Sequence, residues 1–108
     1  LHKDFVHDVN EGARNDGLEK FKKFLEHMNA CYKEELKDIH IMLNDKGDHA
    51  AAEFFVHGEY LKTDLGLPAA HGQKYVIKAG TFFEIQDQKI KRVTTYYNLK
   101  EWIRQVAL

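Results

Sequence analysis

The segment from His49 to Lys62 is a long run in which two kinds of side chain alternate. Its first set of alternate positions is nearly all apolar: Ala50, Ala52, Phe54, Val56, Gly58 and Tyr60. Its second set mixes charged and apolar residues: Ala51, Glu53, Phe55, His57, Glu59 and Leu61. Successive side chains of a β-strand point to opposite faces of a sheet. The pattern therefore predicts one long strand whose first set faces the core, with Phe55 and His57 on the outer face.

Other segments show the same alternation and are separated by turn residues. We expect strands at residues 4–9, 35–43, 73–85 and 89–97, with hairpin turns at 45–48 and 86–88. The stretch between residues 10 and 17 is a loop by composition. Most of the long strands then follow one another through hairpins, which is typical of an antiparallel sheet.

Two segments have helical periodicity. Apolar residues recur at helical spacing from Leu18 to Tyr32, with lysines and glutamates on the opposite side, and Asp16 or Asn15 can cap the start. Near the carboxyl end, Asn98 and Glu101 form a capping-box pattern that predicts a closing helix over residues 99–106. This order of elements predicts an α+β fold rather than alternating βαβ units, with a long helix packed over a curved antiparallel sheet and an apolar pocket between them.

The size and composition restrict the class of protein. With 108 residues, 44% of them hydrophobic and 31% charged, the chain suits one domain with one core. The net charge of -1 is spread along the chain without a basic face, so we expect no nucleic-acid partner. No apolar run is long enough to span a membrane, and the amino end has no signal-peptide pattern. The single cysteine, Cys31, cannot form an internal disulfide, and a cytoplasmic location is the expectation.

Several kinds of chemistry lack the residues that they need. The sequence has no serine, which excludes a serine triad. The seven histidines show no paired ligand spacing such as His-x-x-x-His, and Cys31 stands alone, so we expect no metal and no cofactor. Asp8, which shares a strand face with Val6, remains of interest. At the mouth of an apolar pocket its pKa would be raised and it could act as a general base. The alternative, which the spacing alone favours, is that Asp8 caps the loop after the strand or pairs with Arg14.

Two parts of the chain resemble a known family. The segment Phe5-Val6-His7-Asp8-Val9, followed by a glycine-bearing loop and a helix that starts Gly17-Leu18-Glu19-Lys20-Phe21, resembles the ketosteroid isomerase and SnoaL-like polyketide cyclase group. Residues 72–75, 81–85, 89–93 and 96–98 also follow the strand-turn-strand pattern of that group. It belongs to the nuclear transport factor two-like superfamily. The likeness is strongest to the proteins called ketosteroid isomerase-related, and it spans nearly the whole chain.

The resemblance implies a set of site residues. The catalytic base falls on Asp8, and the acid that donates to the oxyanion falls on Thr81, whose hydroxyl is a weaker donor. Tyr97 could supply the missing donor, and His7, opposite Asp8 in strand parity, could reach the pocket through a bulge. Positions expected to bind the ligand, by the resemblance or by strand parity, are Val6, Ala52, Phe54, Val56, Val93 and Thr95.

Members of the group carry one or two helices before the first strand. Leu1 leads almost directly into a strand here, so we expect residues 1–108 to be a single domain that lacks those helices. With them it would lack the tyrosine that the isomerases contribute from their first helix to the oxyanion hole.

These features predict a protein that binds a small, largely apolar molecule and that could move a proton next to a carbonyl group. Isomerisation, aldol-type cyclisation and dehydration share that step. The alternative is a non-catalytic ligand-binding or assembly domain, because one fold serves many functions. An Asp8 carboxylate buried in a walled pocket favours the enzyme, and one paired with Arg14 favours the binding domain.

The outer face of the predicted sheet carries Phe55, Leu61 and Tyr96 among charged residues. A soluble monomer rarely leaves such a patch in water, so the pattern predicts a homodimer in which the two outer faces meet. The alternative is that the missing amino-terminal helices cover this face.

Overall fold

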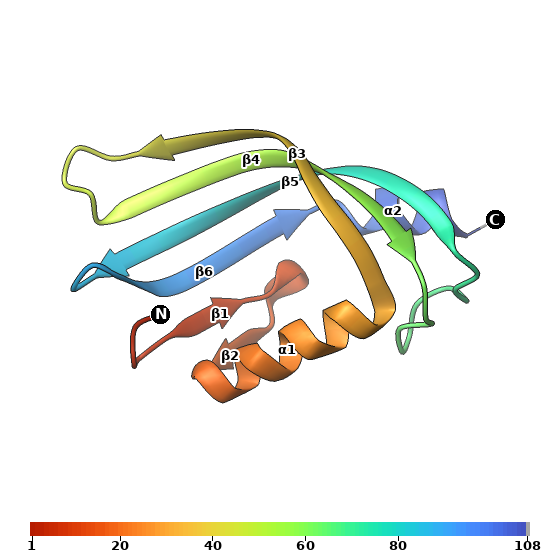
Figure 1. Ribbon diagram of the computed structural model, residues 1–108, viewed down its shortest axis with the longest axis horizontal. Coiled ribbons are helices and arrows are strands. Elements are labelled where there is room, and N and C mark those ends of the chain that lie inside the picture. The colour runs from red at the N-terminus through yellow and green to blue at the C-terminus, as the bar shows by residue number, and fades with distance from the viewer. Residues whose placement is uncertain (108) are drawn as a thin grey trace.

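The computed structural model describes residues 1–107, which form a curved six-stranded sheet and two α-helices (Figure 1). The strands lie in the order β2-β1-β6-β5-β4-β3. The elements in chain order are β1 (Val6–Asp8), the 3-10 turn η1 (Asn10–Gly12), β2 (Arg14–Asp16), α1 (Leu18–Cys31), β3 (Tyr32–Leu43), β4 (His49–Tyr60), β5 (Gln73–Gln86), β6 (Lys89–Tyr97) and α2 (Leu99–Val106). The predicted α+β fold, with a helix packed over a curved sheet, is confirmed.

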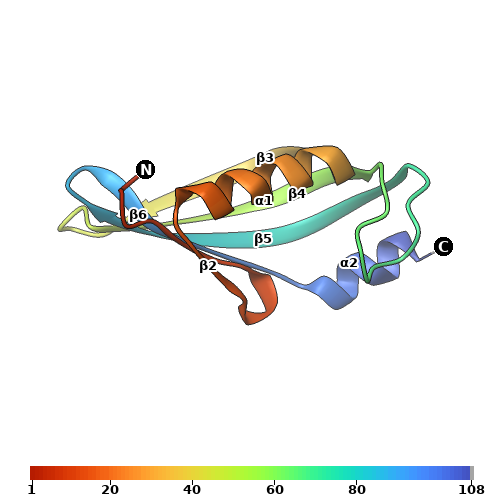
Figure 2. The same cartoon turned by 90° about the horizontal axis from the view of Figure 1, so that it is seen from below.

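The side chains of β4 that are buried and those that are exposed are the ones that the alternation of its sequence predicts. Phe54 and Val56 are both 8% exposed, whereas Phe55 is 37% exposed. Because a slip of one residue would exchange the two faces, this contrast confirms the register of the strand. We call the side that carries Phe54 and Val56 the inner face and the opposite side the outer face. Figure 2 shows the curved sheet with α1 lying along it.

The amino-terminal strands differ from the predicted fully antiparallel sheet. β1 runs parallel to β6, with His7 opposite Val93 and Asp8 opposite Thr94. Residues 14–16, expected to be loop, form β2 and pair with β1 as a short hairpin. Alternation within one strand does not reveal its neighbour or its direction, because both depend on pairing between segments far apart in the chain.

The start of α1 also differs from the prediction. Asp16 belongs to β2, and the N-cap position is held by Gly17 with φ of 92° and no side-chain cap. This φ is favourable only for glycine, so Gly17 makes the sharp turn from β2 into the helix. The helix spans 14 residues, and β3 begins at the next residue, three residues earlier than predicted.

An aromatic cluster closes the core where α2 meets the sheet. The Trp102 ring lies 4.9 Å from the ring of Tyr60, 5.8 Å from that of Tyr75 and 5.9 Å from that of Tyr32. The predicted cap of α2 is confirmed, since the Asn98 side chain accepts a hydrogen bond from the Glu101 amide at 3.1 Å. None of the described helices is long and apolar enough to cross a membrane.

Candidate functional site

A pocket of about 340 Å³ lies between the inner face of the sheet, α1 and α2. We call it the inner pocket. Apolar and aromatic side chains make up most of its wall: Val9, Phe24, Met28, Tyr32, Leu36, Phe54, Val56, Leu67, Tyr75, Ile77, Ala79, Tyr97 and Trp102. Its polar side chains are His7, Asn10, His27, Glu34, Asp64 and Thr95. A mostly apolar wall with a few polar groups is typical of a small-molecule site.

The structure brings some of the predicted site residues to this pocket and not others. His7, Phe54, Val56, Thr95 and Tyr97 line it. Three others share the inner face by register without lining the pocket: Ala52, Thr81 and Val93. The buried Thr81 hydroxyl lies 3.3 Å from the Thr95 hydroxyl, so Thr81 acts on the pocket only through Thr95. Val6 and Asp8 lie on the outer face with their β6 neighbours Arg92 and Thr94.

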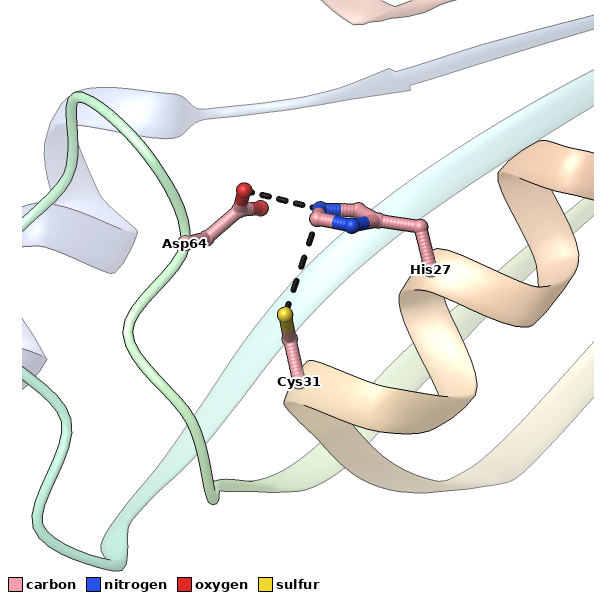
Figure 3. A group of neighbouring side chains, drawn as sticks. All are labelled: His27, Cys31 and Asp64. Carbon is pink, nitrogen blue, oxygen red and sulfur yellow. Dashed lines mark hydrogen bonds and ion pairs between the residues drawn. The ribbon is translucent and has the colours of Figure 1, made fainter.

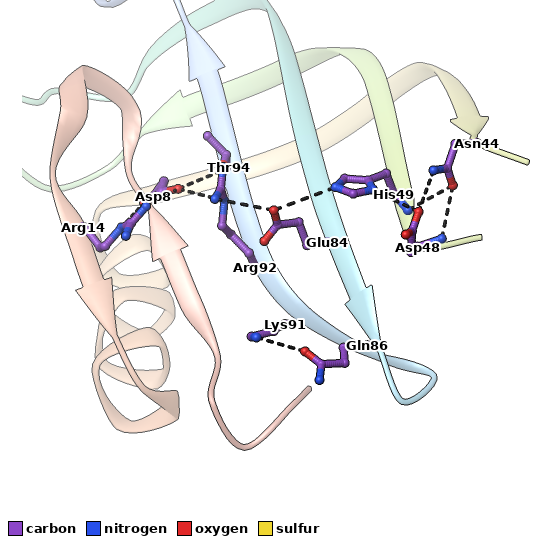
Figure 4. Close-up of polar contacts among 10 residues, drawn as sticks. All are labelled: Asp8, Arg14, Asn44, Asp48, His49, Glu84, Gln86, Lys91, Arg92 and Thr94. Atoms are coloured by element: carbon purple, nitrogen blue, oxygen red, sulfur yellow. Dashed lines mark hydrogen bonds and ion pairs between the residues drawn. The ribbon is translucent and has the colours of Figure 1, made fainter. Parts of the chain in front are cut away.

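The placement and raised pKa expected for Asp8 are wrong. Arg14 Nε donates to Asp8 Oδ1 at 2.6 Å, Thr94 Oγ1 donates to Oδ2 at 3.0 Å, and Arg92 Nε lies 3.1 Å from Oδ2 (Figure 4). The hydrogen bond from Arg14 is the main reason that the pKa of Asp8 lies below its ordinary value, and it outweighs the effect of burial. A carboxylate so paired is a poor proton acceptor. The pairing with Arg14, left open by the sequence, is confirmed.

His7 takes the inner position because β1 pairs in parallel with β6, and no bulge is needed. Its side chain lies against the rings of Phe21 and Phe24, at centroid distances of 5.1 and 4.6 Å. The residue is 3% exposed, and its Nδ1 atom is buried without a hydrogen-bond partner among the described residues. Burial lowers the pKa of His7, while the charge of Asp8 acts in the opposite direction. The imidazole is therefore neutral near pH 7, and its Nδ1 atom has no hydrogen-bond partner among residues 1–107.

Other polar groups of the pocket were not predicted from the sequence. The Tyr75 hydroxyl donates to Glu34 Oε2 at 2.6 Å. Asp64 accepts from the Tyr32 hydroxyl at 2.7 Å and lies 2.8 Å from His27 Nε2. Tyr97, by contrast, was a predicted site residue. Burial raises the pKa of its phenol, with the charge of Glu34 as the next cause, so the phenol remains a proton donor.

The sequence held a signal for one of these groups. Tyr32, Glu34 and Leu36 alternate on the inner side of β3, so a strand predicted from Tyr32 rather than Glu35 would have placed Glu34 in the pocket. Asp64 lies in a loop, where no periodicity indicates a direction.

The pKa of His7 predicts a pH dependence of stability. The unfolded chain takes up a proton on His7 below about pH 6.5, whereas the native imidazole stays neutral to a lower pH. In that window the unfolded state binds more protons, so the free energy of unfolding falls as the pH is lowered. Urea unfolding at several values between about pH 7.5 and 5 should show a smaller loss for His7→Gln than for the wild type. Equal losses would contradict a neutral, buried His7.

Comparison with known proteins identifies relatives of the whole chain. A family model described as SnoaL-like polyketide cyclase matches residues 1–106. The crystal structure of a candidate polyketide cyclase from Pseudomonas putida KT2440 is 55% identical with a TM-score of 0.97, and the match covers 99% of this chain and 80% of that one. A second candidate cyclase, from Silicibacter sp. TM1040, is 52% identical with a TM-score of 0.97 and coverage of 100% and 79%.

A more distant structure shares the fold alone. An NTF2-like protein from Burkholderia xenovorans LB400 is 10% identical with a TM-score of 0.78, and the match covers 97% of this chain and 76% of that one. Among curated proteins none matches the sequence.

Proposed function

The chain belongs to the SnoaL-like polyketide cyclase family, and from that premise we propose that its inner pocket binds a small, largely apolar carbonyl compound and transfers a proton at the carbon next to the carbonyl group. His7, and not Asp8, is the proton acceptor in this proposal. Tyr97 is the donor that stabilises the negative charge on the carbonyl oxygen.

The observation that carries the proposal is that the His7 side chain is buried at the pocket wall and its Nδ1 atom has no hydrogen-bond partner among residues 1–107. A neutral imidazole with an unpartnered nitrogen, enclosed by aromatic rings, is a general base whose pKa has been tuned by burial. Tyr97 lines the same pocket and remains protonated. A preformed hydrogen-bond donor stabilises a developing oxyanion because it is already oriented, whereas water must reorganise around the charge.

The proposed step is the loss of a proton from carbon to an imidazole nitrogen of His7, with the electron pair of the C–H bond moving into an enolate. In a β,γ-unsaturated carbonyl compound, return of the proton from the imidazolium to the γ-carbon gives an isomerisation. Attack of the enolate carbon on a second carbonyl group of the same molecule forms a carbon–carbon bond, closes a ring and turns that carbonyl oxygen into an alkoxide, which takes the proton back from the imidazolium of His7. Ring closure suits a family named for polyketide cyclases.

A ligand screen followed by a hydrogen-exchange assay tests this function. The purified protein is screened by thermal shift against ketones and diketones that fit a cavity of about 340 Å³. Each hit is then incubated with the protein in deuterium oxide, and its α-hydrogens are followed by NMR. We expect catalysed exchange. Ligands that bind without any exchange would support the alternative, a non-catalytic binding domain, which the pairing of Asp8 with Arg14 already favours.

We also propose that the chain forms a homodimer through its outer face. Five large apolar side chains are at least 37% exposed there, and we call them the outer patch: Met42, Phe55, Val76, Phe82 and Tyr96. The ion pairs Lys78–Glu53 and Arg92–Glu84 lie on the same face, so a second copy finds both signs of charge opposite it. A twofold contact uses one patch twice, as this surface permits.

Phe55→Lys should convert the dimer to a monomer, because it places two like charges inside a contact of roughly 800 Å² per subunit. Sedimentation at several concentrations measures the mass. Lys78→Gln, which leaves the apolar part of the outer patch intact, should preserve the dimer. A wild-type mass equal to one chain at every concentration would contradict the proposal.

A further inference from the structure

Three side chains that can bind metal ions converge at one end of the inner pocket (Figure 3). His27 and Cys31 lie one turn apart on α1 and point toward Asp64, which comes from the loop after β4. His27 Nε2 lies 2.8 Å from Asp64 Oδ1 and 3.9 Å from Cys31 Sγ, and the three atoms all lie within 4.8 Å of one another. We call these residues the His-Cys-Asp cluster.

A thiol nucleophile activated by a histidine and an aspartate does not explain this arrangement. Such a relay needs both imidazole nitrogens, one facing the thiol and the other facing the carboxylate. Here the same nitrogen, Nε2, approaches both Cys31 and Asp64. One nitrogen, one sulfur and one oxygen are therefore gathered within 4.8 Å of one another, as the ligands of a metal ion are.

The distances between the three atoms can be compared with those of a tetrahedral site. With metal–sulfur bonds of about 2.3 Å and metal–nitrogen or metal–oxygen bonds of about 2.0–2.1 Å, the ligand atoms lie roughly 3.3–3.6 Å apart. On binding a metal ion, the nitrogen–oxygen distance of 2.8 Å must therefore lengthen and the nitrogen–sulfur distance of 3.9 Å must shorten. The sulfur–oxygen distance, which is at most 4.8 Å, must come into the same range. Rotations of the His27 and Asp64 side chains, which are 52% and 20% exposed, permit shifts of this size.

The surroundings also suit a metal ion. The Tyr32 hydroxyl donates to Asp64 Oδ2 at 2.7 Å, which holds the carboxylate with its other oxygen directed at His27. Hydrogen bonds of this kind orient metal ligands and raise the affinity of a site. Cys31 is 2% exposed, so its sulfur is shielded from bulk water.

We propose that the His-Cys-Asp cluster binds a divalent transition-metal ion, and that its mixed sulfur, nitrogen and oxygen donors fit Zn²⁺ best. Mg²⁺ and Ca²⁺ prefer oxygen ligands alone, whereas thiolate and imidazole together select zinc and its neighbours. Three protein ligands leave a fourth position for water or for a ligand of the pocket, as in catalytic zinc sites. Two of the three residues line the inner pocket, so a bound ion faces its contents.

The site was not foreseen from the sequence, where no His-x-x-x-His pattern exists. His27-x-x-x-Cys31 has the same spacing, with a thiol in place of the second imidazole. The third ligand follows 33 residues after Cys31, in a loop whose position only the tertiary structure provides.

Titration of the reduced, metal-free protein with Zn²⁺ and Co²⁺ tests the site. The experiment requires no substrate, and its result does not depend on whether His7 is the proton acceptor. Calorimetry should show one Zn²⁺ ion per chain. Cobalt should give a thiolate-to-metal charge-transfer band in the near ultraviolet and the visible bands of tetrahedral coordination. Cys31→Ser and Asp64→Asn should each weaken zinc binding by roughly tenfold or more, and Cys31→Ser should abolish the charge-transfer band.

His40→Gln is the matched control, because His40 is exposed on β3 and does not belong to the cluster. It should leave zinc affinity and the cobalt spectrum unchanged. Circular dichroism checks that each variant is folded. If Cys31→Ser is unfolded, the cobalt spectrum of the wild type and the zinc affinity of Asp64→Asn test the proposal. Absence of the charge-transfer band in the wild type, or equal zinc affinity in the wild type and Asp64→Asn, would overturn the proposal.

Discussion

Replacement of His7 by glutamine should slow the exchange of α-hydrogens on a bound carbonyl ligand by roughly 10²–10⁴-fold, the usual contribution of a positioned general base. Glutamine occupies a similar volume and can still form hydrogen bonds, but it does not accept a proton near neutral pH. Binding of the ligand, measured separately by calorimetry, should change much less than the exchange rate. A fall in exchange with little change in affinity separates a role in proton transfer from a role in packing.

Asp8→Asn is the control for this experiment, because Asp8 is the next residue of the same strand and faces the opposite side of the sheet. It removes the charge that Arg14 and Arg92 contact, so it should lower stability modestly and leave exchange within a few-fold of the wild type. If Asp8→Asn instead abolished exchange while His7→Gln retained it, the base would be Asp8, and our assignment of the site would be wrong.

Replacement of Trp102 by alanine should lower the free energy of unfolding by about 3–5 kcal/mol, the usual cost of removing a large buried aromatic side chain. Trp102 is 4% exposed and is in contact with the rings of Tyr32, Tyr60 and Tyr75. The neighbouring strand is not free to move inward, because Gly58 sits so close to Tyr75 that even a Cβ atom would overlap its ring. The cavity left behind would therefore persist, and the inner pocket would be enlarged at this end.

Urea unfolding measures the effect, with Leu65→Ala as the matched control. Leu65 is 98% exposed in the loop after β4, so its truncation removes a large apolar side chain without opening a cavity. The control should stay within about 0.5 kcal/mol of the wild type. A loss below about 1 kcal/mol for Trp102→Ala would show that α2 and its aromatic cluster contribute little to the fold.

Local pattern was sufficient for most of the secondary structure. The strand from Lys89 to Tyr97 and the helix from Leu99 to Val106 lie where alternation and the Asn98 cap predicted them. The burial of Phe54 and Val56 was predicted because apolar residues occupy every second position along this strand. These features depend on residues a few positions apart, so they can be read from sequence alone.

The site could not be read in the same way. Alternation showed that His7 and Asp8 point to opposite faces, but the parallel pairing of β1 with β6 decided that His7 is inside. That pairing joins residues more than eighty positions apart. The resemblance to isomerases placed the base on Asp8, whereas the structure places two arginines around that carboxylate.

The sequence by itself determined the fold class, the family and the two faces of the strand that begins at His49, because backbone geometry imposes short periods that side chains must follow. Only the tertiary structure decided which ionisable groups share the pocket. Glu34 meets Tyr75, and Asp64 meets His27 and Cys31, through contacts between separate elements. Their protonation and metal-binding chemistry depends on distances of a few ångströms and on burial, and neither is a property of a local stretch of chain.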